Sequence, residues 1–346
     1  MKVNFLEANN GDCILVSYEY DGYKKNIMID SGVSKTYEYK IGRLKKEGSL
    51  KKVILDLQEK DQNIDLLIIT HVDDDHIGGI LKYFASNDYD SNLIKKVWFN
   101  SGRLINEYFQ RNSENQNEQE LNEFDTTNTS ISQGVTFESK IESIWDKRLI
   151  KSSLEEINEQ GIKFKILSPN DEKLKKLLTK WEKEAVSSLT SSETDYDKTI
   201  EYLTESDEFK EDQSIHNGSS VAFILEILDK KMLFLGDAHP STIIEKLIED
   251  GISENNKLKL DFVKLSHHAS KANTSYELLK LIDCKKFIVL TDGSFHGLPN
   301  KVTFSRIFNI NNDSELYFNY PHLIDEVFSN EEKSSYILKD SKDLII

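Results

Sequence analysis

Short runs of β-branched and aromatic residues, separated by Gly, Asn and Asp, dominate the first hundred positions of the chain. Such runs are typical of strands, because branched and aromatic side chains pack well on a pleated surface. Between the third and fourth runs, residues 43–57 carry apolar positions at helical spacing, which predicts a helix. The predicted strands of this half are 2–6, 13–20, 25–30, 64–70 and 97–100.

The middle of the chain has a different pattern. Apolar residues almost vanish over 111–123, which indicates a loop or disordered excursion rather than core. Residues 170–186 then predict a helix that begins after a Ser-Pro-Asn start signal. Its apolar stripe is typical of packing against a core and consists of Leu174, Leu177, Leu178, Trp181 and Ala185.

The strand pattern returns after residue 217. Strands are predicted at 220–228, 231–235, 262–266 and 286–291, and helices at 240–250, 275–282 and 303–308. Two strand-rich halves therefore flank a polar, helical segment. This order predicts an α/β fold of the αββα type, in which two sheets pack face to face under outer helices. We expect the first half at 1–102, an insertion at 103–215 and the second half at 216–346.

Composition favours a globular protein outside the membrane. The chain has 346 residues, of which 38% are hydrophobic, enough for a real core. It contains no apolar run of membrane-spanning length, and its first residues do not resemble a signal peptide, so we expect a cytoplasmic protein without a membrane anchor. Cys13 and Cys284 lie in apolar runs and are expected to be buried free thiols.

The formal net charge of −16 acts against unaided binding of polyphosphates. Nucleic-acid-binding proteins usually present a basic face, so this charge weakens a nuclease hypothesis. A pair of bound divalent cations would add about four positive charges at the site of a phosphate, so the hypothesis is not excluded.

One stretch carries an unusual density of ligand-type side chains. His71 and His76 bracket three consecutive carboxylates, Asp73, Asp74 and Asp75, directly after the apolar run 64–69. Acids alone would indicate a solvated turn. Two flanking imidazoles change that interpretation, because like charges repel unless they are paired or coordinate a cation. The stretch therefore predicts a metal site.

Further ligand-type residues follow other predicted strands, where loops present functional groups above a rigid scaffold. Any one of them could be an ordinary turn residue, but their repetition at strand ends favours a shared site. They are Asp30, Asp237, the pair His267 and His268, and His296.

These motifs resemble the metallo-β-lactamase fold hydrolases, and among them stand-alone relatives of the cytoplasmic domain of the ComEC competence protein. His71 to His76 is similar to that family's His-x-[His/Asp]-x-Asp-His loop, with Asp73 at the third position. The similarity extends over both halves in the expected order. It includes 10–16, 27–32, the Asn-Gly-Ser-Ser run at 217–220, the Gly-Asp at 236–237, the His-His at 267–268 and the His-Gly-Leu-Pro at 296–299.

The resemblance implies a centre with two divalent metal ions. Asp237 is expected to bridge them, with His71 and Asp73 on one ion. Asp75, His76 and His267 are expected on the other. A carboxylate at Asp73 makes manganese or magnesium plausible beside zinc.

Two ligand positions remain open in the sequence. The third ligand of the first ion is His216 or Asn217. Many members of the family that the chain resembles carry a histidine four residues before the serine of the next strand, as His216 is before Ser220, whereas the ComEC-like relatives carry an asparagine where Asn217 lies; we favour His216. The last ligand of the second ion is His267 or His268. We favour His267 because it directly follows the strand, which leaves His268 near the substrate or in a supporting position.

Catalytic roles are expected for Asp75, His268 and His296. Asp75 would orient the attacking water as well as ligate. His268 or His296 would donate a hydrogen bond to a substrate oxygen or protonate the leaving group. Asp30 is expected to orient a ligand histidine, and Asp12 to cap a tight turn.

Three functions are compatible with the sequence. The resemblance favours a phosphodiesterase, most of all a nuclease acting on DNA, and soluble relatives suggest an effector in bacterial anti-phage defence. Such an effector would need a protein partner, an ATPase or a sensor, docking on 103–215. A hydrolase of a small ester, thioester or lactam is the first alternative. The second is a partner-binding subunit with an inactive site.

Overall fold

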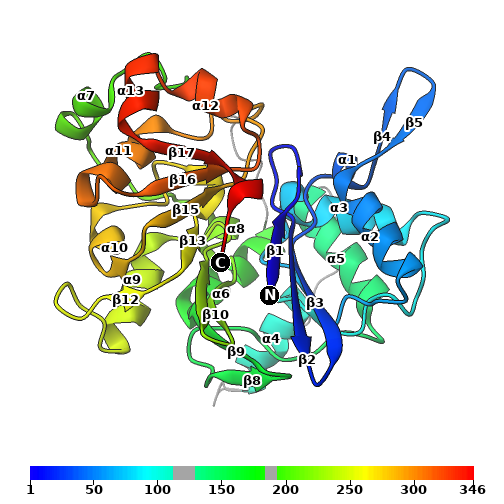
Figure 1. The fold of residues 1–346 in the computed structure, drawn as a ribbon. Coiled ribbons are helices and arrows are strands. Elements are labelled where there is room, and N and C mark those ends of the chain that lie inside the picture. The colour runs from blue at the N-terminus through cyan, green and yellow to red at the C-terminus, as the bar shows by residue number, and fades with distance from the viewer. Residues whose placement is uncertain (112–128, 184–192) are drawn as a thin grey trace.

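The structure is a computed structural model that describes residues 1–111, 129–183 and 193–346. The polar run predicted at 111–123 as a loop lies almost entirely outside these residues. Within them, two large sheets form the centre of the molecule (Figure 1). No described helix is both long enough and apolar enough to cross a bilayer.

The first sheet has five strands in the order β1-β2-β3-β6-β7. The first three pair antiparallel, and β3, β6 and β7 pair parallel. Every strand predicted in this half is present, with ends that differ by at most two residues. They are β1 (Lys2–Phe5), β2 (Ile14–Tyr20), β3 (Tyr23–Ile29), β6 (Leu66–Ile68) and β7 (Val97–Trp98).

The second sheet has eight strands in the order β17-β16-β15-β13-β11-β10-β9-β8. Four of them were predicted, namely β10 (Ala222–Ile227), β11 (Lys230–Phe234), β13 (Phe262–Lys264) and β15 (Lys286–Val289). The other four were not predicted as strands. These are β8 (Ile157–Glu159), β9 (Ile162–Ser168), β16 (Glu315–Phe318) and β17 (Ile337–Asp340).

The two sheets pack face to face through a shared apolar layer. Alternate residues of β2, Ile14 and Val16, contact this layer, which also holds Phe164, Phe223 and Phe234 of the second sheet. Leu15 of β2 points the opposite way, into a layer beneath helices of the first half. The period of two along each strand therefore builds an inner core and two outer cores. This arrangement confirms the predicted αββα sandwich.

Helices cover both outer faces (Figure 1). The first sheet lies under α2 (Ser49–Glu59), α3 (Asp74–Phe84), α4 (Gly102–Arg111), α5 (Thr129–Ile141) and α6 (Asp171–Lys183). The second lies under α9 (Pro240–Glu249), α10 (Tyr276–Lys280), α11 (Lys301–Ile310) and α12 (His322–Val327). The remaining elements are short: α1 (Ser34–Tyr37), α7 (Ile200–Glu205), α8 (Ile215–Gly218), α13 (Asn330–Ser335), and the strand pairs β4 (Glu38–Ile41) with β5 (Leu44–Glu47) and β12 (Leu258–Lys259) with β14 (Ile282–Asp283).

The predicted helix at 43–57 begins too early. Residues 44–47 are strand β5, which pairs with β4 in a hairpin closed at Gly42, and the helix itself is Ser49–Glu59. Gly42 has φ = 60°, a left-handed conformation that favours glycine and reverses the chain here. Leu44 is 65% exposed, so it lies outside the apolar face of α2.

The segment expected as an insertion contributes directly to the sandwich. Within 103–215, β9 pairs antiparallel with β10, and β8 pairs with β9. Asp195 accepts hydrogen bonds from the backbone N–H groups of Lys301 and Val302, at the start of α11. The described parts of this segment are therefore built into the second sheet and its helices.

The contact between Arg306 in α11 and Asp207 in the 103–215 segment allows us to predict how much this segment contributes to stability. The guanidinium of Arg306 is 1% exposed and donates two hydrogen bonds of 2.7 Å to the carboxylate of Asp207. Removing one partner of a buried pair leaves the other charge uncompensated. We expect Asp207→Ala to lower the free energy of unfolding by about 3–5 kcal/mol in urea titrations. Glu208→Ala, an exposed neighbour, should change it by less than about 0.5 kcal/mol; equal effects would contradict the assignment.

Candidate metal centre

The acidic loop lies between a buried strand and a helix. β6 ends at Ile68, His71 follows, and α3 begins at Asp74 with Asp74 and Asp75 in its first turn. Carboxylates are favourable at a helix N-terminus because they complement the helix dipole. His76 is fully buried in the same turn. The local fold thus presents His71, Asp73, Asp75 and His76 at one edge of the first sheet.

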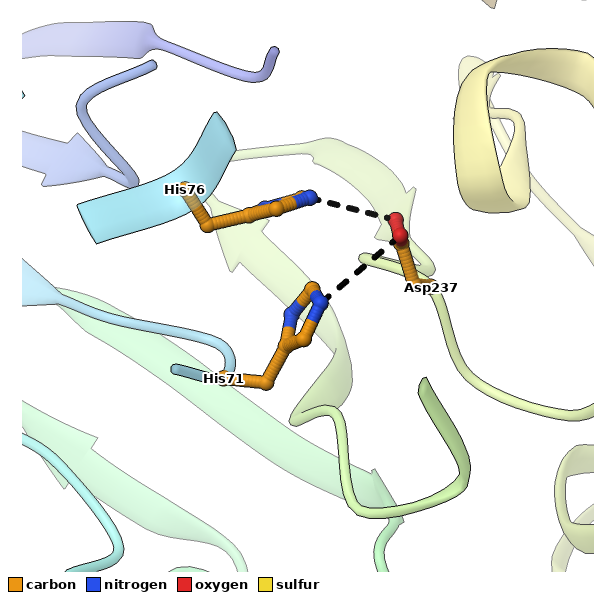
Figure 2. Close-up of side chains that lie close together, drawn as sticks. All are labelled: His71, His76 and Asp237. Atoms are coloured by element: carbon orange, nitrogen blue, oxygen red, sulfur yellow. Dashed lines mark ion pairs between the residues drawn. The ribbon is translucent and has the colours of Figure 1, made fainter. Parts of the chain in front are cut away.

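Asp237 reaches the same place from the second sheet. It follows β11 after a turn at Gly236, and it is 2% exposed. Its carboxylate lies 3.7 Å from Nε2 of His71 and 3.5 Å from Nε2 of His76 (Figure 2). The two halves of the sandwich therefore meet at these three side chains.

Three buried atoms in this group have no hydrogen-bond partner among the described residues: Nε2 of His71, Nε2 of His76 and Oδ1 of Asp237. An unsatisfied buried polar atom costs about 1–3 kcal/mol, so three in contact need an explanation. Imidazole nitrogen and carboxylate oxygen are ordinary ligands of zinc and related divalent ions. The donor set therefore fits a divalent metal.

The electrostatic field of the candidate metal centre also favours a bound cation. Burial alone would lower the pKa of His76, but the carboxylates of Asp237, Asp30 and Asp75 raise it well above its usual value. Burial alone would raise the pKa of Asp237, whereas His76 and His267 hold it well below its usual range. The carboxylates are thus ionised, and positive charge is stabilised between them.

Asp30 orients His76 from behind. Its Oδ2 lies 2.8 Å from Nδ1 of His76, and its two oxygens accept hydrogen bonds from the backbone N–H and the hydroxyl of Thr70. An ionised carboxylate only accepts, so Nδ1 carries the proton and Nε2 is left facing Asp237. Asp30 therefore lies where it would hold the imidazole of His76 with Nε2 directed at Asp237.

We expect Asp30→Asn to lower metal affinity about 10- to 100-fold, because the amide holds the imidazole less firmly in its tautomer and orientation. Isothermal titration with Mn²⁺ and Zn²⁺ measures the change. Asp65→Asn is the matched control, since Asp65 contacts Lys25 and Asn26 rather than a histidine. If Asp30→Asn binds metal as tightly as the wild type, Asp30 has no orienting role.

His216, from α8, lies beside Asp73. Its Nδ1 donates a 2.7 Å hydrogen bond to Asp73, whose other oxygen is 3.6 Å from Nε2 of His71. Asn217 points elsewhere, since its side-chain amide donates to Asp212. Of the two residues left open by the sequence, His216 is therefore the one that joins His71 and Asp73.

His267 and His268 occupy different depths. His268 is 2% exposed, its Nε2 lies 3.1 Å from Asp75, and it groups with Asp75 and His76. His267 lines the cavity, and its Nε2 lies 3.8 Å from Asp237. Both have positive φ, 46° and 54°, so the chain bends sharply between them. The structure thus places His268, rather than the favoured His267, beside Asp75.

Asp12 lies beside His268, whose Nδ1 donates a 2.8 Å hydrogen bond to the carbonyl of Leu290. It is 1% exposed, forms an ion pair with the buried Lys264, and lies 3.4 Å from Nδ1 of His268. Burial would raise the pKa of Asp12, but Lys264 and His268 lower it to about 2. The same contacts with Asp12 and Asp75 overcome burial and raise the pKa of His268 to about 10.

Asp212 is a site residue that the sequence did not reveal. Its Oδ2 accepts hydrogen bonds from the side-chain amides of Asn217 and Asn273 and lies 3.7 Å from Nδ1 of His267. It comes from an extended segment without apolar periodicity, so the sequence carried no signal for it. Lys264 was also missed, although a lysine inside the apolar run 262–265 is an indication of a buried partner.

An open cavity of about 1030 Å³ lies above the centre. His296 lies at the wall of this cavity, and its side chain is exposed. Partial desolvation of the ring, together with the charge of His267, lowers the pKa of His296. Four apolar residues line the cavity, and the rest of the wall is polar or charged. The lining is Asn10, Val33, Asp73, Asp74, Asp75, Glu193, Asp212, Ser214, Asn217, Asp237, His267, Ser270, Lys271, Ala272, Phe295, His296, Leu298 and Asn300.

Solved structures with partial resemblance include the following three proteins. A possible metal-dependent hydrolase from Veillonella parvula is 10% identical, with 97% of this chain and 94% of that chain covered and a TM-score of 0.41. An isothiocyanate hydrolase from Delia radicum gut bacteria is 13% identical, with 98% and 95% covered and a TM-score of 0.40. CmlA, a diiron β-hydroxylase from Streptomyces venezuelae, is 11% identical, with a TM-score of 0.41. The match covers 98% of this chain but only 52% of CmlA, so this chain spans about half the length of that protein.

No curated protein matches the chain. A family model does match its first part, over residues 7–105, and its description is the Metallo-beta-lactamase superfamily. The matched stretch contains Asp12, Asp30 and the whole run from His71 to His76. The first half of this αββα sandwich, with the acidic loop of the candidate metal centre, therefore matches the metallo-β-lactamase superfamily.

Proposed function

We propose that the protein is a metal-dependent phosphodiesterase that acts on DNA. The observation that carries the proposal is the convergence of His71, His76 and Asp237, whose buried ligand-type atoms lack hydrogen-bond partners among the described residues. Asp237 also lines a wide cavity in which most of the lining residues are polar or charged. We propose that His71, Asp73 and His216 hold one divalent ion. Asp75, His76 and His268 would hold a second, with Asp237 between the two.

Two such ions would lower the pKa of water and neutralise negative charge that develops on a phosphate oxygen. The chain itself supplies orientation. Asp30 holds His76 in place, and the carbonyl of Leu290 accepts a hydrogen bond from Nδ1 of His268, with Asp12 close by. Asp212 lies behind His267. The lowered pKa of His296 keeps its imidazole neutral near pH 7, so one ring N–H is available to a substrate oxygen at the cavity wall.

The character of the cavity favours a phosphodiester over a small acyl substrate. Sites for small molecules are mostly apolar and enclose their ligand. This cavity is open, and most of its lining is polar or charged, which suits an extended polar substrate. The small ester, thioester or lactam hydrolase remains the second candidate, because six carboxylates of the lining repel a polyanion unless cations neutralise them.

The test is a substrate panel with purified protein in Mn²⁺, Mg²⁺ or Zn²⁺. It compares bis(p-nitrophenyl) phosphate with a chromogenic lactam, a thioester and a carboxylic ester. The proposal expects turnover of the phosphodiester and none above background for the acyl substrates. Turnover confined to an acyl substrate would assign the second candidate function, and a protein that binds metal but turns over no substrate would support an inactive, partner-binding site.

Histidine variants test the proposed ligand set. We expect His268→Asn to reduce bound metal from two ions per chain to about one, because His268 lies against Asp75 and His76. His267→Asn should keep two ions and lower only turnover. Native mass spectrometry counts the ions. Loss of an ion from the His267 variant alone would return the ligand role to His267.

The resemblance to stand-alone ComEC relatives also leads us to propose a cellular role as an effector of antiviral defence, with an ATPase or sensor partner on 103–215. Co-purification of the tagged protein with such a partner from its host tests this role.

A further inference from the structure

A two-stranded hairpin projects from the body of the first half. β4 and β5 pair only with each other, and Figure 1 shows them extending away from α1 and α2. All side chains from Tyr39 to Glu47 are exposed. An isolated hairpin is at best marginally stable in water. Because this hairpin is exposed on both faces and gains little from packing, a binding role would explain its presence. We name residues 38–47 the basic arm.

The register divides the basic arm into two different faces. Glu38 is opposite Glu47, and Lys40 is opposite Lys45, so these four share one charged face. Tyr39 is opposite Lys46, and Ile41 is opposite Leu44, so the other face is apolar apart from one lysine. Tyr39, Ile41 and Leu44 are 38%, 59% and 65% exposed. The arm thus presents an apolar strip to solvent.

The charge of this region is opposite to that of the chain. Residues 35–52 contain seven lysines or arginines and two glutamates, in a protein with net charge −16. On the arm, Lys45 pairs with Glu38 at 3.0 Å. Lys40, Arg43 and Lys46 form no ion pair within the described parts of the chain. Three cations are therefore available to an external anion.

The base of the arm is rigid and adjoins the cavity. Val33 lines the cavity, and the helix that it precedes, α1, leads directly into β4. Gly48 N–H donates to the carbonyl of Tyr37, which joins the two ends of the arm, and the hydroxyl of Tyr37 donates to Asp88. The arm is therefore connected through α1 to the wall of the cavity.

We propose that the basic arm is a polynucleotide-binding element, which holds the phosphate backbone with Lys40, Arg43 and Lys46 and contacts sugars and bases with Tyr39, Ile41 and Leu44. A two-stranded ribbon fits the major groove of a duplex, and aromatic and apolar side chains contact bases in single strands. This inference rests on the proposed phosphodiesterase function and names how its polyanionic substrate overcomes the net charge of the chain.

The test measures binding apart from cleavage. Fluorescence anisotropy with a labelled 30-nucleotide strand and a 30-base-pair duplex, in EDTA and at several salt concentrations, compares three proteins. They are the wild type, the arm variant Lys40→Ala/Arg43→Ala/Lys46→Ala, and the control Lys24→Ala/Lys257→Ala/Lys259→Ala. The control removes the same charge from exposed positions elsewhere. Because the replaced side chains of the arm are exposed, the arm variant is expected to fold, and its Tm checks this.

We expect the arm variant to bind at least about tenfold more weakly at 100 mM salt, with a salt dependence reduced by about 2–3 in slope. The control should stay within about twofold of the wild type. Ile41→Ser/Leu44→Ser should weaken binding without changing the slope. The proposal is overturned if the arm variant binds like the wild type or if the wild type binds neither nucleic acid. It is also overturned if Ile41→Ser/Leu44→Ser converts a dimer into a monomer, which would make this face a contact between copies.

Hydrolysis of bis(p-nitrophenyl) phosphate separates this inference from the proposed function. The small substrate does not reach the arm, so the arm variant should hydrolyse it at the wild-type rate while it loses polynucleotide binding. If the wild type binds nucleic acid through the arm but hydrolyses no phosphodiester, the arm proposal stands and the phosphodiesterase proposal fails.

Discussion

Asp237→Asn is expected to lower kcat for phosphodiester hydrolysis about a thousandfold or more. Asp237 faces both His71 and His76, so the amide removes the one carboxylate shared between the two proposed ion positions. When several residues act together in catalysis, removing one of them abolishes most of the rate enhancement that they provide together. Initial rates with bis(p-nitrophenyl) phosphate, with metal in excess, measure the loss.

Asp74→Asn is the matched control for that experiment. Asp74 follows Asp73 in the same loop and lines the same cavity, but its carboxylate accepts a hydrogen bond from Gln133 and faces away from the three central side chains. We expect its kcat within about threefold of the wild type. Equal losses in both variants would mean that general charge in the cavity, rather than ligation at Asp237, governs the rate.

Divalent metal is expected to stabilise the fold strongly. A ligand at a thousand times its Kd adds about 4 kcal/mol to the free energy of unfolding. For a chain of this size, such a gain raises Tm by about 5 °C or more. Differential scanning fluorimetry with Mn²⁺ or Zn²⁺, before and after EDTA, measures the shift. The stabilisation is expected because the unsatisfied atoms of His71, His76 and Asp237 gain a partner.

Asp237→Asn provides the control here as well. In EDTA, this variant should unfold in a clear transition with a Tm close to that of the wild type. It should lose most of the increase in Tm that metal gives the wild type. A metal-induced rise of the same size in the variant would place the ion elsewhere on the protein.

The outline of the sandwich was predictable because its buried strands are short apolar runs. Ile14, Leu15 and Val16 are all apolar because β2 is buried on both faces, with successive side chains in two different cores. β9 was missed although Ile162, Phe164 and Ile166 alternate with lysines, because it lies within a region whose polar composition dominated the interpretation. The hairpin β4–β5 was missed because each of its strands has only four residues, and the second was included in the helix predicted at 43–57.

At the site, chain order predicted which loops meet, because loops after neighbouring strands gather at one edge of a sheet. Chain order did not predict which of the two adjacent histidines lies buried beside Asp75 and which lines the cavity. His267 and His268 differ in depth because of three consecutive left-handed residues, ending at Ala269, and backbone strain of this kind leaves no mark on residue type. Asp212 and Lys264 act through contacts far apart in sequence, which only the folded chain brings together.

The most direct test of the central claim uses end-labelled DNA. Single-stranded and duplex DNA are incubated with wild type or Asp237→Asn in Mn²⁺, Mg²⁺ or Zn²⁺, and the products are separated by length. A metal-dependent phosphodiesterase that acts on DNA predicts cleavage by the wild type that disappears in EDTA and in the variant. DNA that stays intact with every metal, or that Asp237→Asn cleaves as fast as the wild type does, would contradict it.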